Sequence, residues 1–133
     1  MKFLREITRK FKYNLKFLSK NKKIKLNYVV NSSSNSKLTE LMNFYGSDKG
    51  GRNNHHNYSE YYSELFFNER KNIKNFLEIG LGTNDVNMLS NMGEKGVPLA
   101  SLKAWRDYFE NAIIYGADID KKILKNHERI KTY

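Results

Sequence analysis

Apolar residues recur every three or four positions between residues 3 and 18, with lysines and arginines between them. This spacing gathers the apolar side chains on one face and predicts an amphipathic helix. The apolar positions are Phe3, Leu4, Ile7, Phe11, Leu15 and Leu18. Such a helix can lie on an anionic membrane surface or dock on a partner. Alternatively, it covers the protein's own apolar surface or serves as an arm in dimerisation, and we favour this second interpretation.

The polar run of residues 31–36 is of low complexity and predicts a linker between segment 1–30 and a domain of residues 37–133. Helical spacing returns after it, with Leu38, Leu41, Met42 and Tyr45 on one face. Gly46 is a plausible C-cap of this helix. Residues 47–57 are rich in Gly, Asn and His and predict a loop, and a second helix is expected from Tyr58 to about Lys71.

Two short apolar runs, Phe76 to Ile79 and Ala112 to Asp118, predict buried strands. A long loop, residues 83–100, follows the first strand. Ser101 then resembles the N-cap of a helix that directs Leu102, Trp105 and Phe109 toward the sheet. A further helix is expected over residues 121–128, and residues 130–133 resemble a third strand. The order of strands and helices predicts an α/β fold with a doubly wound sheet.

Two glycines and an aspartate mark the ends of the predicted strands. Gly80 and Gly82 permit the positive φ and close backbone approach that a turn against a ligand requires. Asp118 ends the second strand, where a carboxylate can accept hydrogen bonds from the ribose hydroxyls of an adenosine. Asp120 is a second candidate for cofactor binding, or a cap of the following helix. The pattern therefore predicts a nucleotide-type cofactor site, although such glycines also occur in ordinary turns.

The residues around the glycines argue against a dinucleotide. In the dinucleotide fingerprint a third glycine lets a helix N-terminus approach the pyrophosphate, but this chain has Asp85 there. A carboxylate at that position repels a pyrophosphate. Glu78, inside the first strand, is also unusual for a phosphate binder. Both acids suit a cofactor that carries a sulfonium and an ammonium, so an NAD-type oxidoreductase is disfavoured.

The pattern E-x-G-x-G of residues 78–82 resembles the first motif of class I S-adenosylmethionine-dependent methyltransferases, and Gly116-Ala117-Asp118 resembles the second. Further segments follow in the order of the macrolide sugar O-methyltransferase subgroup: residues 46–50, 56–58, Tyr62, 101–109 and 115–120. The resemblance covers roughly residues 37–133. It implies a Rossmann-like sheet, S-adenosyl-L-methionine as cofactor, and a methyl acceptor that is a small molecule or glycan, such as a sugar hydroxyl of a glycoside or surface polysaccharide.

The resemblance also implies roles for individual residues. Glu78 would orient the glycine loop or contact the methionine end of the cofactor, and Ser101 could reach the cofactor carboxylate or only cap its helix. His56 and Tyr58 belong to the segment that closes over the cofactor, or are solvated loop residues. Asp48 and Lys49 would polarise the substrate or form a capped turn. The candidate cofactor-binding residues are thus Glu78, Gly80, Gly82, Ser101, Asp118 and Asp120.

The sequence names no catalytic base and predicts no metal site. Adjacent histidines such as His55 and His56 usually point in different directions, so they do not make a two-histidine site without partners. Mg²⁺, where used, would be bound by residues that the resemblance places beyond Tyr133.

The net charge of +10 is unevenly distributed. Residues 1–28 carry +9, and the remaining residues carry +1. Basicity is therefore a property of the first segment, and the alternative function is a non-catalytic module that binds nucleic acid or anionic membrane through it. We expect only weak contact with anionic surfaces, and no specific nucleic acid. The chain has no cysteine, which excludes disulfides and thiolate metal sites. It contains neither a spanning-length apolar run nor a secretory signal, so we expect a cytoplasmic protein.

The pattern supplies three strands, whereas a doubly wound sheet needs more. Its first strand is normally central and pairs on its far side with the fourth, so this chain would leave that edge open. We therefore expect the N-terminal half of a methyltransferase domain that is inactive alone, and a homo-oligomer remains an open alternative.

Overall fold

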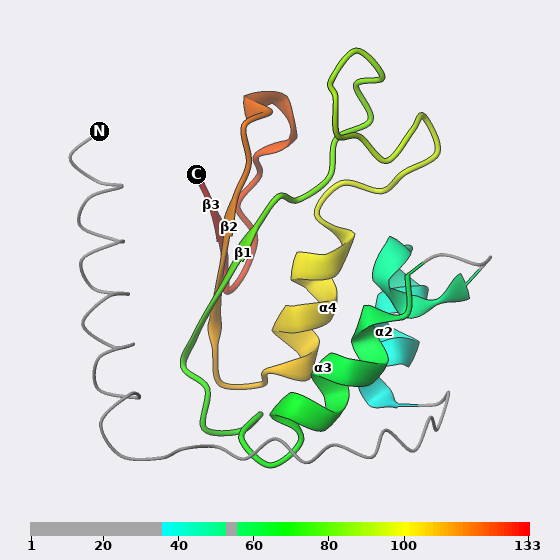
Figure 1. The fold of residues 1–133 in the computed structure, drawn as a ribbon. Coiled ribbons are helices and arrows are strands. Elements are labelled where there is room, and N and C mark those ends of the chain that lie inside the picture. Colours follow the sequence, from blue (N-terminus) through cyan, green and yellow to red (C-terminus); the bar gives the residue numbers. More distant parts are fainter. Residues whose placement is uncertain (1–35, 53–55) are drawn as a thin grey trace, which may run out of the picture. The chain divides into compact units, whose positions relative to one another are not determined.

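The computed structural model describes residues 36–52 and 56–133. Three parallel strands, β1 (Asn75–Ile79), β2 (Ile113–Ala117) and β3 (Ile130–Thr132), form a sheet in the order β1-β2-β3. Helices α2 (Lys37–Tyr45), α3 (Tyr58–Phe66) and α4 (Ala100–Tyr108) lie together on one side of this sheet (Figure 1). The predicted α/β class is confirmed. The predicted amphipathic helix of residues 1–30 and the linker up to residue 35 lie outside the described residues.

The register of the sheet positions the residues of the candidate site. Glu78 on β1 lies opposite Gly116 on β2, and Ile79 lies opposite Ala117. The space where a side chain at Gly116 would stand is filled by Leu102 of α4 and by Leu81. Only glycine fits there, and its small size lets α4 pack closely on the sheet next to Glu78.

Helix α2 forms where the sequence predicts it. The Ser36 hydroxyl accepts a hydrogen bond from the Thr39 amide at 3.1 Å and caps the N-terminus. At the other end Gly46 adopts the left-handed conformation, with φ 81°. The Ser47 amide then donates to the Met42 carbonyl at 2.8 Å, which completes a Schellman cap. This confirms the predicted role of Gly46.

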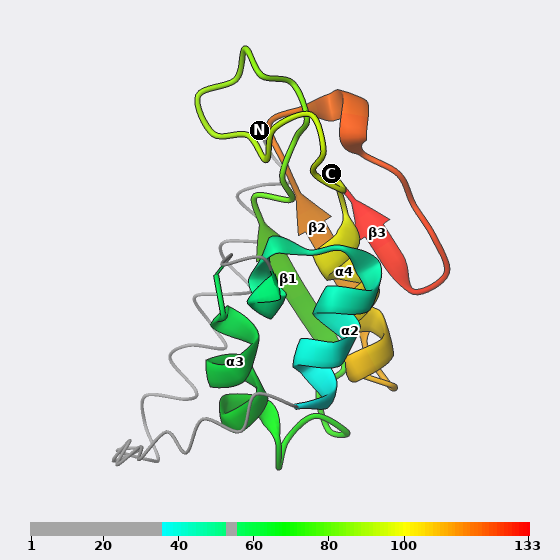
Figure 2. The same ribbon diagram turned by 90° about the vertical axis from the view of Figure 1, so that its right-hand side faces the viewer.

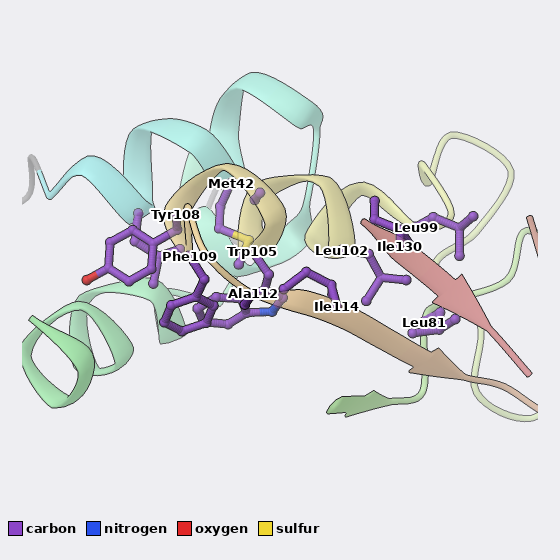
Figure 3. Packing of buried hydrophobic residues seen from close by; sticks show 12 residues of the cluster. Met42, Leu81, Leu99, Leu102, Trp105, Tyr108, Phe109, Ala112, Ile114 and Ile130 are labelled. Carbon is purple, nitrogen blue, oxygen red and sulfur yellow. The ribbon is translucent and has the colours of Figure 1, made fainter. Parts of the chain in front are cut away.

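The core lies between β2 and β3 and the helices, mainly α4 (Figure 3). Trp105 and Phe109 of α4 stack with their ring centroids 5.4 Å apart, and Phe76 of β1 lies 4.6 Å from Trp105. Phe66 of α3 contacts the same group edge to face. This aromatic cluster joins α3, α4 and β1 and fixes α3 beside the first strand. The remaining core side chains include Leu38, Met42, Leu81, Leu99, Leu102, Ile114 and Ile130.

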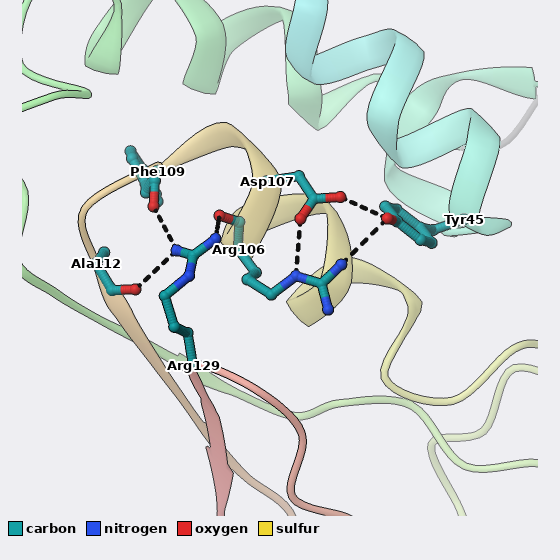
Figure 4. Close-up of polar contacts among 6 residues, drawn as sticks. All are labelled: Tyr45, Arg106, Asp107, Phe109, Ala112 and Arg129. Carbon is teal, nitrogen blue, oxygen red and sulfur yellow. Dashed lines mark hydrogen bonds and ion pairs between the residues drawn. The ribbon is translucent and has the colours of Figure 1, made fainter.

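The C-terminal end of α4 is capped by a side chain from far along the chain (Figure 4). The Arg129 guanidinium donates to the carbonyls of Phe109 and Ala112, each at 3.1 Å, and of Arg106 at 3.0 Å. The Phe109 carbonyl also accepts from the Ala112 amide at 3.1 Å, and the positive charge of Arg129 suits the negative end of the helix dipole. Arg129 itself takes a φ of 55°, an uncommon conformation that these three bonds help to hold.

Two predicted helices are shorter in the structure than the sequence predicts. Helix α3 ends at Phe66 rather than near Lys71, because residues 67–72 form turns that lead the chain into β1. The predicted helix of residues 121–128 is only a 3₁₀ turn, Lys121–Ile123. After it the Asn126 side chain accepts from the Thr132 amide at 2.8 Å, and Arg129 turns toward α4. These long-range bonds outweigh the weak local helix propensity.

Helix α4 begins two residues earlier than predicted, so Ser101 is not its N-cap. Leu99 occupies the cap position with a φ of 65° and a buried side chain, and makes no side-chain capping bond. Ser101 lies inside the first turn and is itself buried. Its hydroxyl therefore faces the sheet rather than the helix end.

Within the described residues β1 pairs only with β2, so its outer edge carries no strand. The face of the sheet opposite α4 is covered by none of the described helices (Figure 1). Among residues 36–52 and 56–133, no helix combines the length and apolar character needed to cross a bilayer.

Candidate functional site

The loop after β1 exposes its backbone at the carboxyl end of the sheet. Gly80 and Gly82 have φ values of 84° and 78°, in the left-handed region that favours glycine. The Gly80 amide donates to the Ala117 carbonyl at 2.9 Å and keeps the loop attached to β2. A side chain at Gly80 would meet no atom within 4 Å. The backbone here is therefore open to a ligand.

Asp118 fastens this loop to the end of β2. Its Oδ2 accepts from the Leu81 amide at 2.6 Å, and its Oδ1 accepts from the Asp120 amide at 2.8 Å. The side chain is only half-buried. Because each carboxylate oxygen can accept two hydrogen bonds, Asp118 retains acceptor capacity after both bonds are made.

Asp120 is more enclosed and is already engaged on both oxygens. The Thr83 hydroxyl donates to Oδ2 at 2.5 Å and the Lys122 amide donates to Oδ1 at 2.9 Å. These two donors, the hydroxyl above all, lower the pKa of Asp120. Asp120 thus caps the 3₁₀ turn Lys121–Ile123 and ties the loops after β1 and β2 together, which agrees with the capping alternative. Figure 2 shows both loops leaving the same end of the sheet.

A second group of polar side chains surrounds Glu78, which lies on β1 two residues before Gly80. The Lys49 ammonium lies 3.4 Å from Glu78 Oε1 and 3.3 Å from Asp48 Oδ1. The Ser101 hydroxyl donates to the same Glu78 oxygen at 3.0 Å. Glu78 Oε2 is buried and has no hydrogen-bond partner. Both side chains of the ion pair are largely enclosed, with 11% of Glu78 and 23% of Lys49 exposed.

Burial and charge compete at this pair. Burial raises the pKa of Glu78, and the opposing effects of Lys49 and Ser101 do not cancel it. Burial would lower the pKa of Lys49, but the two carboxylates reverse this and raise it. Lys49 therefore stays charged, while the charged form of Glu78 is costly in the absence of a further partner.

The ion pair lies on the wall of a hollow of about 360 Å³ beside β1. Aromatic residues from α3, α4 and β1 form most of the remaining wall: Tyr58, Tyr62, Phe66, Phe76 and Trp105. The end of β1 and the following Gly80 also line it, so the hollow adjoins the glycine loop. His56 is exposed and stacks on Tyr58, with ring centroids 4.8 Å apart.

No family model and no curated protein matches this chain. Solved structures of MycE, a methyltransferase from the mycinamycin biosynthetic pathway, do match. The complex of MycE with Mg, SAH and mycinamycin VI is 27% identical to the chain, with a TM-score of 0.54. One crystal form of the complex with Mg and SAH is 29% identical, with a TM-score of 0.55. Each covers 74% of this chain, which spans only 24% of MycE.

The fold is a partial methyltransferase fold. The likeness extends over the three parallel strands and their helices, and it supports the predicted resemblance to the macrolide sugar O-methyltransferase subgroup. Because the chain spans about a quarter of MycE, the likeness concerns only part of that enzyme.

The methyltransferase fold brings the predicted site residues into two adjoining groups. Gly80, Gly82, Asp118 and Asp120 lie at the carboxyl ends of the strands. The connected polar group beside the hollow consists of Asp48, Lys49, Glu78 and Ser101. Tyr58 lines the hollow, and His56 stacks on Tyr58. Whether these residues bind a cofactor or close over it stays a prediction.

The sequence analysis missed two contributors to the site. Thr83 joins the two loops, and Phe66 lines the hollow together with Tyr62, which the sequence analysis named only as part of the resemblance. Phe66 was recognisable from spacing, because Tyr58, Tyr62 and Phe66 follow one another at intervals of four on the same helical face. Trp105, expected in the core, is buried there and also borders the hollow.

The structure also bears on the sequence arguments about Asp85 and about a metal site. Asp85 does not begin a helix; its side chain is partly exposed and accepts from the Asn87 amide at 3.1 Å. The dinucleotide arrangement thus lacks the helix N-terminus that would bind a pyrophosphate there. No group of three or more His, Asp or Glu side chains in the described part of the chain is arranged to hold a metal. His55 lies outside that part.

Proposed function

We propose that this chain forms the cofactor-binding part of an S-adenosylmethionine-dependent methyltransferase. The observation that carries the proposal is the exposed glycine loop bound to Asp118 at the carboxyl ends of β1 and β2, in a fold similar to that of MycE. The MycE structures hold SAH, the demethylated product of S-adenosylmethionine.

The residues present fit this cofactor on three counts. The open backbone at Gly80 allows close approach, and Asp118 retains acceptor capacity for two ribose hydroxyls. The buried Glu78 Oε2 lacks the donor that an ammonium would supply. When bound, the cofactor supplies an electrophilic methyl group on a sulfonium. The chain's own residues position it, which is the main contribution a protein makes to such a transfer.

The methyl acceptor is proposed to be a sugar hydroxyl of a glycoside or polysaccharide, on the strength of the motif resemblance. Such a hydroxyl must lose its proton during transfer. We assign no side chain of the described residues as the base that removes it. Mg²⁺ is present in the MycE structures, and we propose that any such ion would require ligands outside the described residues.

We also propose that activity requires protein surface beyond the described residues. The hollow beside Glu78 adjoins β1, whose outer edge carries no strand in the described part of the chain. Further structure at that edge would enclose the hollow and exclude water from the reacting groups.

Calorimetric titration of the full chain with SAH and with NAD tests the proposal. We expect SAH to bind more tightly, because Glu78 and Asp85 disfavour a pyrophosphate while Asp118 suits an adenosine. Tighter binding of NAD, or no binding of SAH, would overturn the cofactor assignment.

A further inference from the structure

The two glycines of the glycine loop have different surroundings. A side chain at Gly80 would meet no atom within 4 Å, whereas a Cβ at Gly82 would collide with the sulfur of Met92 and lie 2.6 Å from its methyl carbon. The Met92 side chain therefore lies directly against the backbone of Gly82. Close approach of a ligand fits Gly80, while at Gly82 the absence of a side chain makes room for Met92.

Met92 belongs to the loop of residues 83–95, which extends beyond the end of the sheet (Figure 1). A Cβ at Gly96, just after this loop, would collide with the Cβ of Met92. The Met92 amide also donates to the Thr83 carbonyl at 2.8 Å. Met92 thus packs on both glycines that flank the loop, Gly82 and Gly96, and holds the two ends of the loop together.

The thioether of Met92 is open to chemical change. Its side chain is only partly buried, so hydrogen peroxide has access to it from solvent. In the oxidation the sulfur gives an electron pair to one peroxide oxygen, the O–O bond breaks, and the products are the sulfoxide and water. The new oxygen is polar, and the contact with Gly82 leaves no room for it on that side of the sulfur. The sulfoxide must therefore leave its place against Gly82.

The other methionines of the described residues lack this arrangement. Met42 is fully buried in the core. Met88 is partly exposed in a turn and is not among the nearest neighbours of any described glycine. Oxidation of Met88 would therefore leave the packing at both ends of the loop unchanged.

We propose that Met92 is a redox-sensitive latch, which holds residues 83–95 against Gly82 as the thioether and releases them as the sulfoxide. The released residues include Thr83, whose hydroxyl joins the loops after β1 and β2 through Asp120. Oxidation therefore loosens the glycine loop at the carboxyl end of the sheet. The latch consists of protein groups alone, so it stands or falls independently of the proposed cofactor.

Limited trypsin digestion of the full chain, before and after hydrogen peroxide treatment, tests the latch. Trypsin cleaves after Lys95. The Asn84 side chain donates to the carbonyls on both sides of it, of Glu94 and Gly96, at 3.0 and 2.7 Å. These bonds keep the segment from the protease until the loop opens. Cleavage after Lys125, which is exposed outside the loop, is the internal control for global unfolding.

We expect oxidation to raise the rate of cleavage after Lys95 roughly tenfold and after Lys125 by less than about twofold. Met88→Leu should keep this response, and Met92→Leu, similar in volume but without sulfur, should lose it. Methionine sulfoxide reductases should restore slow cleavage. Mass spectrometry identifies the cleaved bonds and the oxidised methionines.

Three results would overturn the proposal: Met92 that stays unoxidised, cleavage after Lys95 that does not change once Met92 is oxidised, and an equal rise after both lysines. An undiminished response in Met92→Leu would do the same. If Met92→Leu is cleaved quickly even before treatment, reversal by the reductases in Met88→Leu decides instead, because Met92 is then the partly exposed methionine that remains among the described residues.

Discussion

Among single residues, Asp118 combines a structural and a proposed binding role. Its carboxylate accepts two main-chain amides and has capacity left for a ligand. Asp118→Ala should weaken SAH binding by about 1.5 to 3 kcal/mol, the range for losing hydrogen bonds to a charged group. Titration calorimetry measures the loss. Asp85→Ala is the matched control, because Asp85 is a partly exposed carboxylate of the same loop whose hydrogen bonds go to Asn87. Equal affinities of the two variants would remove Asp118 from the ligand site.

Glu78 should make stability depend on pH. Its pKa is raised in the folded state above the ordinary value of 4.5, mainly by burial. Folding therefore favours the protonated form, and this contribution is complete below about pH 4.5 and is lost as pH rises through the folded pKa. Denaturant unfolding from pH 4.5 to 8 should show a decline in stability that Glu78→Gln reduces. Parallel profiles for the two proteins would show that ionisation of Glu78 does not oppose folding.

At the scale of elements, Arg129 links β3 to the end of α4. The carbonyls of Arg106 and Phe109 at the end of α4 and of Ala112 just before β2 share its guanidinium, so Arg129→Met leaves all three without this donor. We expect a loss of about 1.5 to 3 kcal/mol in the free energy of unfolding. Lys131→Met, on the exposed side of β3, should change it by less than about 0.5 kcal/mol. Similar values for the two variants would mean that the cap contributes little.

Local signals predicted the elements whose ends are determined locally. The Ser36 and Gly46 caps of α2 are formed by neighbours in sequence, and so are visible as a pattern. The conformation of residues 121–128 is not determined by neighbours in sequence. Its path depends on Arg129 reaching α4 and on Asn126 binding Thr132, and local propensity carries no information about either contact.

The same distinction applies to the candidate site. The glycine loop and Asp118 were predictable because each follows directly from a strand, and parallel strands bring their carboxyl ends together. The contact of Lys49 with Glu78 joins a turn to a strand 29 positions away. Motif resemblance placed both residues near the site, but only the packing of the turn against β1 shows that they form an ion pair.

For the molecule as a whole, the open edge of β1 is the main weakness. Within the described residues the edge is unpaired, and Ile79 at its end is 78% exposed. Unpaired strand edges and exposed apolar side chains favour association. We expect the isolated 133-residue chain to unfold over a broad temperature range and to bind an apolar dye before it unfolds. A sharp two-state melt without dye binding would show that the edge is protected.

The hydrogen bonds from Leu81 to Asp118 and from Thr83 to Asp120 connect the two loops through groups of the protein itself. The ordering of the glycine loop thus belongs to the folding equilibrium rather than to binding. A ligand that needs this loop closed binds only the fraction of molecules in which both bonds are intact. Its apparent affinity therefore reports on the population of that state, so that the Thr83 hydroxyl, without touching a ligand, sets how much of the protein is ready to receive one.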